Sequence, residues 1–472
     1  MNEISPDPCQ DLEGIAWREG RLHIEDLDAE NLAQRVGTPT YVYSAAAIRR
    51  AYNSTMDAFA PLGAKVHYAL KASANLHLCR LLRDLGAGMD VVSGGEMERA
   101  WLAGTPMAEI AFAGVAKTEA EIRAALDGRH SPLRHGAERF GRTRIEDRGP
   151  VGLFNVESES ELARIARIAG ELGQRARISI RVNPDVDART HEYTTTGKEE
   201  NKFGIFHQSV PPLFDAWARH PALDLSGLHV HIGSPVREVE PFVSAARVLL
   251  ALMDDLESAG HPISHLDLGG GWAVNYLSGE APSAAEYAQA LEPLLRSRVE
   301  QGLQILLEPG RSILANAGVL LTRVQHVKEG RQKRFLLCDA GMHTLIRPAL
   351  YKAYHFMWPA VPAKGLLPAE RAMDFDLPGL HPCDVVGPIC ESGDFLARDR
   401  NLPPMAQGDL LAIFSAGAYG MSMSSNYNDH GRPAEVLVDG ARATLIRERQ
   451  ELANLLEYER VARDLDLGGT SP

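Results

Sequence analysis

The stretch Val66-His-Tyr-Ala-Leu-Lys71 ends an apolar run in a lysine, and the rest of the chain is best interpreted outward from it. The residues before the lysine predict a buried strand, since short apolar runs are typical of strands covered on both faces. Burial disfavours the ammonium form, and a neutral amine is the form that attacks an aldehyde to make a Schiff base. Most lysines at strand ends point into water, so a catalytic role for Lys71 needs support from other residues of the chain.

Short apolar runs recur after Val66–Leu70, and amphipathic helical patterns such as Leu76–Leu85 and Glu157–Leu172 lie between them. Eight strand–helix units within roughly 250 residues favour an α/β fold of the (β/α)8 TIM barrel type, with a doubly wound open sheet as the competitor. The remaining predicted helices include Val239–Ala259 and Ala284–Val299, and the remaining predicted strands are Met89–Val92, Ile110–Ala113, Leu153–Val156, Ile178–Val182, Leu228–Ile232, Leu266–Leu268 and Ile305–Leu307.

Beyond Ser312 the rhythm changes to β-rich segments broken by Gly, Pro and Asp, which predicts a second domain of sandwich-like or barrel-like form. We expect the N-terminal segment, with a β-like lead-in and a short helix, to join it. The predicted divisions are residues 1–37 for that segment, 38–311 for the barrel and 312–472 for the second domain. The predicted elements here are Gly14–Glu25, Asp28–Val36, Gly318–Val327, Arg334–Cys338, Asp384–Ile389, Asp409–Phe414, Glu435–Val438 and Ala443–Ile446.

Two segments have the character of insertions. Arg129–Pro150 is charged and lacks periodicity, and Pro359–Pro382 is rich in Pro and Gly. Either can be a loop or a lid, and a solvated surface insertion is the simpler interpretation of the first.

Composition excludes several classes of function. With 472 residues, of which 45% are hydrophobic and 24% charged, the chain is an ordinary globular protein. Its formal charge of −13 argues against a nucleic-acid or anionic-membrane partner, because no basic excess can neutralise phosphates. An anionic substrate must therefore be held by local arginines.

The five cysteines are scattered and contain no C-x-x-C pair, so neither a disulfide framework nor a metal site is indicated. The acidic N-terminus lacks an apolar core of the signal-peptide kind, and no stretch approaches about 18 consecutive apolar residues. These features predict a cytoplasmic protein.

Unusual residues fall at the predicted carboxyl ends of the strands, where a barrel of this type places its active site. Gly269, Gly270 and Gly271 follow one strand, and glycines let backbone N–H groups close around a phosphate, although a tight turn is their default explanation. Glu308 ends the next strand, where its carboxylate could keep a pyridine nitrogen protonated. A strand-end ion pair with Arg311 is the alternative.

The sixth predicted strand ends in a run that includes His231 and Ser234. His231 could lie over the face of a planar cofactor, while Ser234 could donate to its phosphate, yet a lone histidine is more often a satisfied core residue. Asp90, near the end of the second strand, could orient Lys71 or His231 by a charged hydrogen bond.

Together Lys71, Gly269 to Gly271 and Glu308 resemble the Schiff-base lysine, phosphate loop and pyridine glutamate of the fold-type III pyridoxal-phosphate decarboxylases. The resemblance narrows to the diaminopimelate decarboxylase family, which makes lysine, and runs from about residue 14 to about residue 459. It narrows through Asp339-Ala-Gly-Met-His-Thr-Leu-Ile-Arg347-Pro-Ala-Leu-Tyr351, Gly387-Pro-Ile-Cys390-Glu391-Ser-Gly-Asp394 and Ser415-Ala-Gly-Ala-Tyr419-Gly-Met-Ser-Met-Ser-Ser-Asn-Tyr427.

That resemblance implies pyridoxal 5'-phosphate as cofactor and meso-2,6-diaminopimelate as substrate. It also implies that Cys390 protonates the substrate's α-carbon and that Glu391 holds its distal ammonium. In this family the Cys-Glu loop reaches the partner's active site, so the resemblance implies a homodimer. The distal carboxylate would be held by Arg311, Arg347 and Tyr351, with Tyr419 touching both phosphate and substrate, and the cofactor would contact Asp90, His231, Ser234, Gly269, Gly270, Gly271, Glu308, Gly310 and Arg311.

Four features depart from the usual family pattern, namely Ser73 after Lys71-Ala, Pro235 after the His-Ile-Gly-Ser run, and the two insertions. A decarboxylase for ornithine, arginine or carboxynorspermidine is the nearest alternative, and Glu391 and Arg347 weigh against it. An amino-acid racemase of the same barrel usually has an arginine where Glu308 stands. The alternative from another class is a non-catalytic regulator, which retention of Lys71 and Cys390 disfavours.

Overall fold

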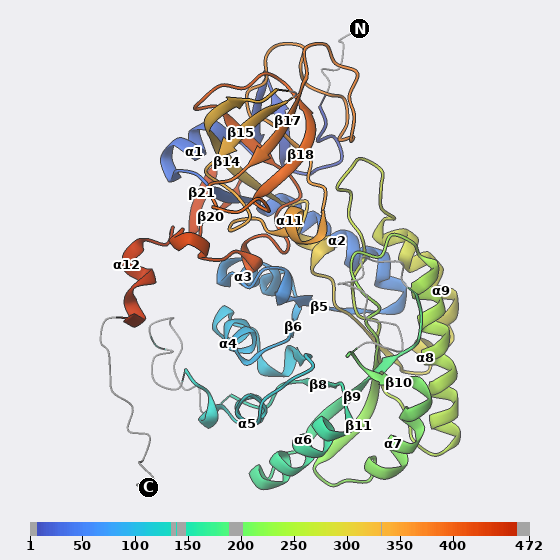
Figure 1. Ribbon diagram of the computed structural model, residues 1–472. Coiled ribbons are helices and arrows are strands. Elements are labelled where there is room, and N and C mark those ends of the chain that lie inside the picture. The colour runs from blue at the N-terminus through green and yellow to red at the C-terminus, as the bar shows by residue number, and fades with distance from the viewer. Residues whose placement is uncertain (1–6, 134–137, 139–147, 188–201, 332, 460–472) are drawn as a thin grey trace, which may run out of the picture.

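The computed structural model describes residues 7–133, 138, 148–187, 202–331 and 333–459. Two domains are visible in Figure 1: a parallel barrel surrounded by helices, and a β-rich domain in which the N-terminal segment lies beside strands from the last third of the chain. Most of the first insertion falls outside the described residues.

Eight parallel strands form the barrel, and the sheet closes because β13 pairs with β5 while β8 pairs with β9. This closure confirms the (β/α)8 prediction and excludes the open sheet. All eight predicted strands are present, although one begins five residues earlier than predicted. The strands are β5 (Lys65–Ala69), β6 (Gly88–Val91), β7 (Ile110–Phe112), β8 (Leu153–Val156), β9 (Ala176–Asn183), β11 (Leu223–His229), β12 (His265–Asp267) and β13 (Gln304–Leu307), with the short β10 (Ile205–Phe206) beside β9.

Helices cover the outside of the barrel because they turn an apolar face toward the strands, and several begin with a polar capping side chain. In α6, for example, the Ser158 side chain caps the first turn while Leu162, Ile165 and Ile168 are buried. The barrel helices are α2 (Ala45–Phe59), α3 (Leu76–Asp84), α4 (Gly94–Ala103), α5 (Glu119–Leu126), α6 (Glu159–Leu172), α7 (Val210–Trp217), α8 (Glu240–Ser258), α9 (Ala284–Glu300) and α10 (Arg311–Leu314).

The second domain is a mixed sheet of nine strands, with the small antiparallel sheet of the N-terminal segment packed against it. The Trp17 ring packs 5.4 Å from the Phe414 ring, which joins the two sheets. All six predicted β segments are confirmed, and β4, β16 and β18 are additional. The elements are β1 (Ile15–Arg18), β2 (Arg21–Ile24), β3 (Leu27–Asp28), α1 (Ala29–Val36), β4 (Thr40–Ser44), β14 (Gly318–Glu329), β15 (Arg334–Cys338), α11 (Arg347–Tyr351), β16 (Met357–Pro359), β17 (His381–Val386), β18 (Phe395–Leu402), β19 (Leu410–Ile413), β20 (Ala434–Asp439), β21 (Arg442–Arg447) and α12 (Leu452–Leu455).

The strand β4 corrects the predicted division at residue 37. It pairs with β14 and β20 of the second domain, so it belongs to that sheet and not to the barrel. All five of its side chains are buried, which a strand at the centre of a sheet requires. We therefore propose that the barrel domain begins at α2.

None of the helices in the described part of the chain is both long and apolar enough to span a bilayer.

Candidate active site

Lys71 lies in a short 3₁₀ turn, Leu70–Ala72, directly after β5, so it stands at the carboxyl end of the barrel as predicted. Its Nζ donates to Asp90 Oδ2 over 2.9 Å, and Asp90 at the end of β6 is fully buried. The lysine side chain keeps 27% of its surface exposed, so a ligand can reach the amine. Asp90 therefore orients the lysine, which is one of the two roles the sequence suggested.

The charge on Lys71 differs from the prediction. Burial works against the ammonium, but the carboxylates of Asp90 and Glu308 outweigh it and raise the pKa of Lys71 above its usual value. Desolvation therefore does not make this amine neutral, because two strand ends bring anions beside it. Burial and Glu308 raise the pKa of Asp90, whereas Lys71 lowers it, and the net shift is upward.

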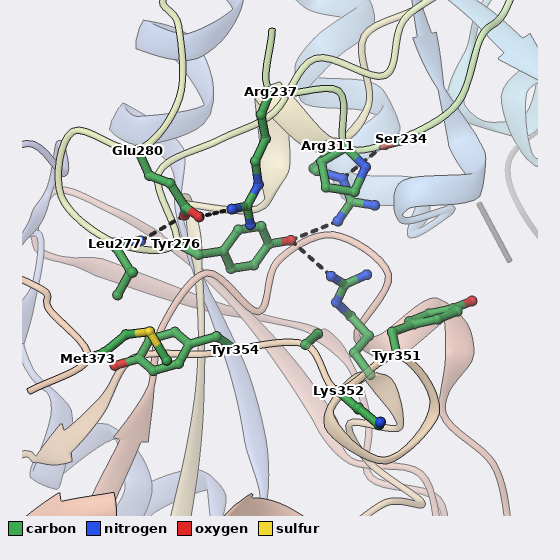
Figure 2. Close-up of a pocket in the computed structure, with 13 residues that line it drawn as sticks. Ser234, Arg237, Tyr276, Leu277, Glu280, Arg311, Tyr351, Lys352, Tyr354 and Met373 are labelled. Atoms are coloured by element: carbon green, nitrogen blue, oxygen red, sulfur yellow. Dashed lines mark hydrogen bonds and ion pairs between the residues drawn. The ribbon is translucent and has the colours of Figure 1, made fainter. Parts of the chain in front are cut away.

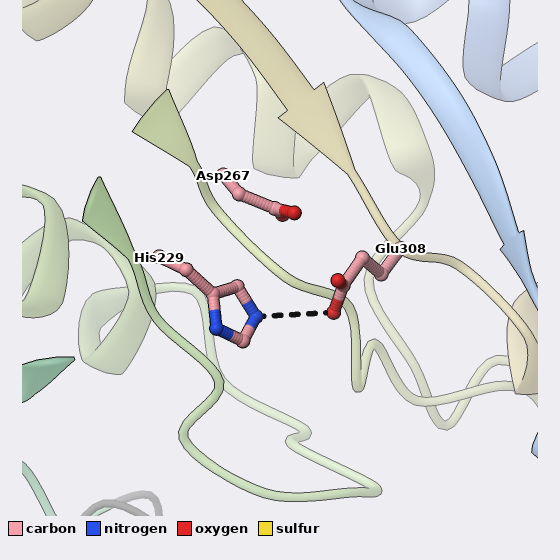
Figure 3. Close-up of side chains that lie close together, drawn as sticks. All are labelled: His229, Asp267 and Glu308. Carbon is pink, nitrogen blue, oxygen red and sulfur yellow. Dashed lines mark hydrogen bonds and ion pairs between the residues drawn. The ribbon is translucent and has the colours of Figure 1, made fainter. Parts of the chain in front are cut away.

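His229, Asp267 and Glu308 form a compact polar cluster at the strand ends (Figure 3), and Glu308 interacts electrostatically with Lys71. His229 Nε2 lies 3.2 Å from Glu308 Oε2, and Asn155 Nδ2 donates to Glu308 Oε1 over 3.0 Å. Burial opposes ionisation of Glu308, but His229 and Lys71 lower its pKa below the usual range. Burial and Glu308 raise the pKa of Asp267, whose Oδ1 accepts from Gly269 N–H. The cluster thus lowers the pKa of one carboxyl group and raises the pKa of its neighbour.

This cluster can serve two kinds of ligand. One donor atom from each of His229, Asp267 and Glu308 lies within 4.8 Å of the others, which is close enough to share a metal ion. The raised pKa of Asp267 disfavours the carboxylate form that binds metals, whereas the lowered pKa of Glu308 favours the carboxylate form that suits a protonated ring nitrogen. Sequence reasoning missed His229, Asn155 and Asp267. Their position at the ends of predicted strands was the available signal.

The glycine loop packs directly against the segment that carries Ser234. A Cβ on Gly271, whose φ is +99°, would lie 1.9 Å from the carbonyl oxygen of Gly233. The Gly270 N–H donates to His231 Nδ1 over 3.4 Å, and burial together with Lys71 lowers the pKa of His231 well below its usual value. The glycine loop and His231 therefore lie together, while the suggested place of His231 over a cofactor stays a prediction.

Two arginines line a cavity of about 530 Å³ beside this loop (Figure 2). Arg311 Nε donates to Ser234 Oγ over 3.0 Å, and its guanidinium lies 4.7 Å from the ring centre of Tyr419. Arg347 is buried, and its Nε has no hydrogen-bond partner within the described residues. Tyr351 lies beside it, 5.7 Å from guanidinium carbon to ring centre.

The other predicted residues fall into two groups. Gly310 packs against Ala69 and Ala72, on either side of Lys71, and a Cβ there would lie 3.1 Å from both. Cys390 and Glu391 do not line the cavity described above; both are exposed, and Glu391 lines a separate depression near Lys333. One chain therefore brings together every predicted site residue except this pair.

Comparisons with known proteins agree with this geometry. A family model described as the pyridoxal-binding domain of pyridoxal-dependent decarboxylases matches residues 45–315. The diaminopimelate decarboxylase of Pseudomonas aeruginosa is 45% identical over 95% of this chain and 99% of its own, and that of Vibrio cholerae is 42% identical over 94% and 97%.

Solved structures give the same result. Diaminopimelate decarboxylase from M. jannaschii in complex with L-lysine is 34% identical, with a TM-score of 0.83 over 95% of this chain and 98% of that one. The Helicobacter pylori enzyme with L-lysine is 36% identical, with a TM-score of 0.78 over 91% and 98%. A lysine/ornithine decarboxylase from Vibrio vulnificus is 21% identical, with a TM-score of 0.70 over 87% and 97%, and shares the fold.

Proposed function

Because the chain belongs to the diaminopimelate decarboxylase family, we propose that it converts meso-2,6-diaminopimelate into L-lysine and carbon dioxide, the last step of lysine biosynthesis, with pyridoxal 5'-phosphate as cofactor. The observation that carries this proposal is the cavity lined by Arg311 and Arg347, since Arg311 packs on Tyr419, which in turn lies near the accessible Lys71. A substrate with a carboxylate at both ends requires cations at the far end of the pocket, and planar guanidinium groups suit a carboxylate.

The residues present fit the cofactor. An anionic carboxylate at Glu308, an amine at Lys71 and a glycine loop beside Ser234 and Arg311 match a pyridine nitrogen, an aldehyde and a phosphate in turn. When bound, pyridoxal phosphate supplies a ring that withdraws the electrons left behind as carbon dioxide departs. Lys71 would hold it as the Schiff-base lysine, and His231 would lie against the ring.

Proton positions follow from the charges described above. Lys71 must lose a proton before its amine can bond to carbon, and Asp90 Oδ2, 2.9 Å from Nζ, is placed to accept it. His229 faces one oxygen of Glu308, and Asn155 donates a hydrogen bond to the other. Both contacts favour the carboxylate form of Glu308, so this residue can hold a proton on the ring nitrogen.

At the substrate, Arg311, Arg347 and Tyr351 would bind the distal carboxylate, and Tyr419 would lie between Arg311 and Lys71. Cys390 would deliver the proton to the α-carbon, and Glu391 would hold the distal ammonium. Both are exposed and do not line the cavity of their own chain, so we propose a homodimer in which this loop completes the partner's site. Exposed Leu350 and Tyr427 support a covered surface nearby.

We also propose that the enzyme works in the cytoplasm. All five of its cysteines are unpaired, which fits a reducing compartment, since oxidising compartments favour disulfides.

The function is tested by measuring carbon dioxide release from meso-diaminopimelate, ornithine, arginine and lysine. Diaminopimelate is expected to exceed the others by on the order of 10²-fold or more in kcat/KM, because they leave the arginines or the distal-ammonium site unfilled. Preference for ornithine or arginine would replace the proposed substrate, and release from none of them would favour a regulatory role.

Glu391→Ala is expected to raise KM for diaminopimelate, or to lower kcat, by about 10- to 100-fold, because a charged hydrogen bond to the distal ammonium is lost. Cofactor absorbance should not change. Ser392→Ala, at the next exposed position, is the matched control and should behave as wild type. Loss of the cofactor from the Glu391 variant would mean that the residue has been misplaced.

A further inference from the structure

Tyr276 joins the two arginines of the cavity (Figure 2). Its hydroxyl oxygen accepts from Arg311 Nη1 over 2.7 Å and from Arg347 Nη2 over 3.3 Å. The side chain is buried and lines the cavity. A phenol oxygen has two acceptor positions and one proton, so accepting from both guanidinium groups leaves the O–H as its remaining hydrogen-bonding group.

The electrostatics of this arrangement need the phenol. Burial and the like charge of Arg311 lower the pKa of Arg347, which means that the two guanidinium groups repel each other in a dry site. Burial raises the pKa of Tyr276, but the two arginines outweigh it and lower the value below the usual one. The phenol dipole therefore offsets the repulsion and fixes the distance between the two cations.

The loop that carries Tyr276 is held from the second insertion. Arg371 is fully buried, and its Nη2 donates to the carbonyl of Asn275, the residue before Tyr276. On the other side, the Ser278 N–H donates to the Arg371 carbonyl over 2.9 Å, and the Arg371 N–H donates to Ser278 Oγ. Both guanidinium NH₂ groups also donate to the Asp11 carboxylate, at 2.6 and 2.8 Å.

We propose that Tyr276 is a positioning residue that holds Arg311 and Arg347 as one carboxylate-binding array, and that Arg371 of the second insertion sets this array by clamping residues 275–278. The proposal rests on the proposed function, in which these arginines bind the distal carboxylate of the substrate. It gives the segment 359–382 a role in affinity for that carboxylate. On this proposal, the segment 359–382 is present to hold the arginine array, and it need not act as a lid or as a solvated loop.

The test compares two inhibitors of the same length. L-Lysine keeps the carboxylate that the arginines would bind, whereas cadaverine is lysine without it. In the intact holoenzyme, Tyr276→Phe is expected to weaken inhibition by L-lysine by about 10-fold or more while leaving cadaverine unchanged, because charged hydrogen bonds to the phenol oxygen are lost. KM for diaminopimelate should rise more than kcat falls.

Tyr287→Phe is the matched control. Tyr287 is equally buried, and its hydroxyl donates over 2.9 Å to the carbonyl of Val236, away from both arginines. It should change the thermal midpoint as much as Tyr276→Phe does, yet keep the ratio of the two inhibition constants. A shift of that ratio in the control variant would show that any lost phenol has this effect, and it would overturn the proposal.

Arg371 is tested by a double-mutant cycle with Tyr276→Phe. Arg371→Met alone is expected to reduce the preference for L-lysine over cadaverine, and it should reduce it no further in the Tyr276→Phe background. If the double variant instead loses preference by the product of the two single effects, Arg371 does not act through Tyr276 and this part of the proposal is wrong. Asp11→Asn, which weakens the ion pair but keeps the contacts of Arg371 with residues 275 and 278, should stay close to wild type in this ratio even if its thermal midpoint falls.

Failure of this inference differs from failure of the proposed function. If wild type releases carbon dioxide from diaminopimelate but Tyr276→Phe weakens both inhibitors equally, the positioning role is wrong and the function stands. If wild type does not use diaminopimelate and does not prefer L-lysine over cadaverine, the proposed function is wrong and the array has no carboxylate to bind.

Discussion

Lys71→Ala is expected to lower turnover of diaminopimelate by on the order of 10³-fold or more, because it removes the accessible amine that follows β5 and would bond to the cofactor. The same change should abolish the visible absorption that the cofactor gains on bonding to a protein amine. Borohydride treatment of wild type should fix a pyridoxyl group on the peptide that contains Lys71, and mass spectrometry of the digested protein identifies that peptide.

The matched control for this change is Lys65→Ala. Lys65 begins the same strand, β5, and its side chain is exposed at the opposite end of the barrel from Lys71. It should keep both the absorption and the activity of wild type. A pyridoxyl label on any other lysine, or substantial activity in the Lys71 variant, would contradict the assignment and with it the proton transfer to Asp90.

The barrel could be predicted from sequence because the pattern that marks each of its strands lies within a few consecutive residues. Each strand is a short apolar run that ends in a polar or glycine-rich turn, and the eight runs were found although their ends moved by a few residues. Three strands of the second domain, β4, β16 and β18, were not predicted, the last two for reasons local to their own sequences. β18 lies at the edge of its sheet and carries Arg398, Asp399 and Arg400, which hide the alternation, and β16 has three residues and ends in proline.

Features that depend on contacts between residues far apart in the sequence could not be predicted. Thr40–Ser44 has the composition of a strand, but its partners lie at residues 318–321 and 434–438, so its sheet is decided by contacts far along the chain. The charge of Lys71 has the same cause, since Asp90 and Glu308 reach it from two other strands. Tyr276 and Arg371 are 95 residues apart, and nothing in either local sequence indicates that one holds the loop of the other.

Mixing two inactive variants should restore activity if the loop that carries Cys390 completes the partner's site. Lys71→Ala and Cys390→Ala dimers each have lesions at both sites. After dissociation and random reassociation, half of the dimers are hybrids, and in each hybrid one site has the intact Lys71 of one chain and the intact Cys390 of the other. The mixture should therefore recover about a quarter of wild-type activity, since the interface of a two-fold dimer is the same from both sides.

The control mixes Lys71→Ala with Arg347→Met. Both residues belong to the site of one chain, because Tyr276 links Arg347 to Arg311, and Tyr419 is close to both Arg311 and Lys71. Every site of that hybrid then carries one lesion, and no activity should return. Recovery in neither mixture, although hybrid dimers form, would place Cys390 in its own chain's site, and the exposed Cys-Glu loop would have to move toward the cavity to act there. Recovery in both mixtures would mean that Arg347, rather than Cys390 alone, reaches across the interface.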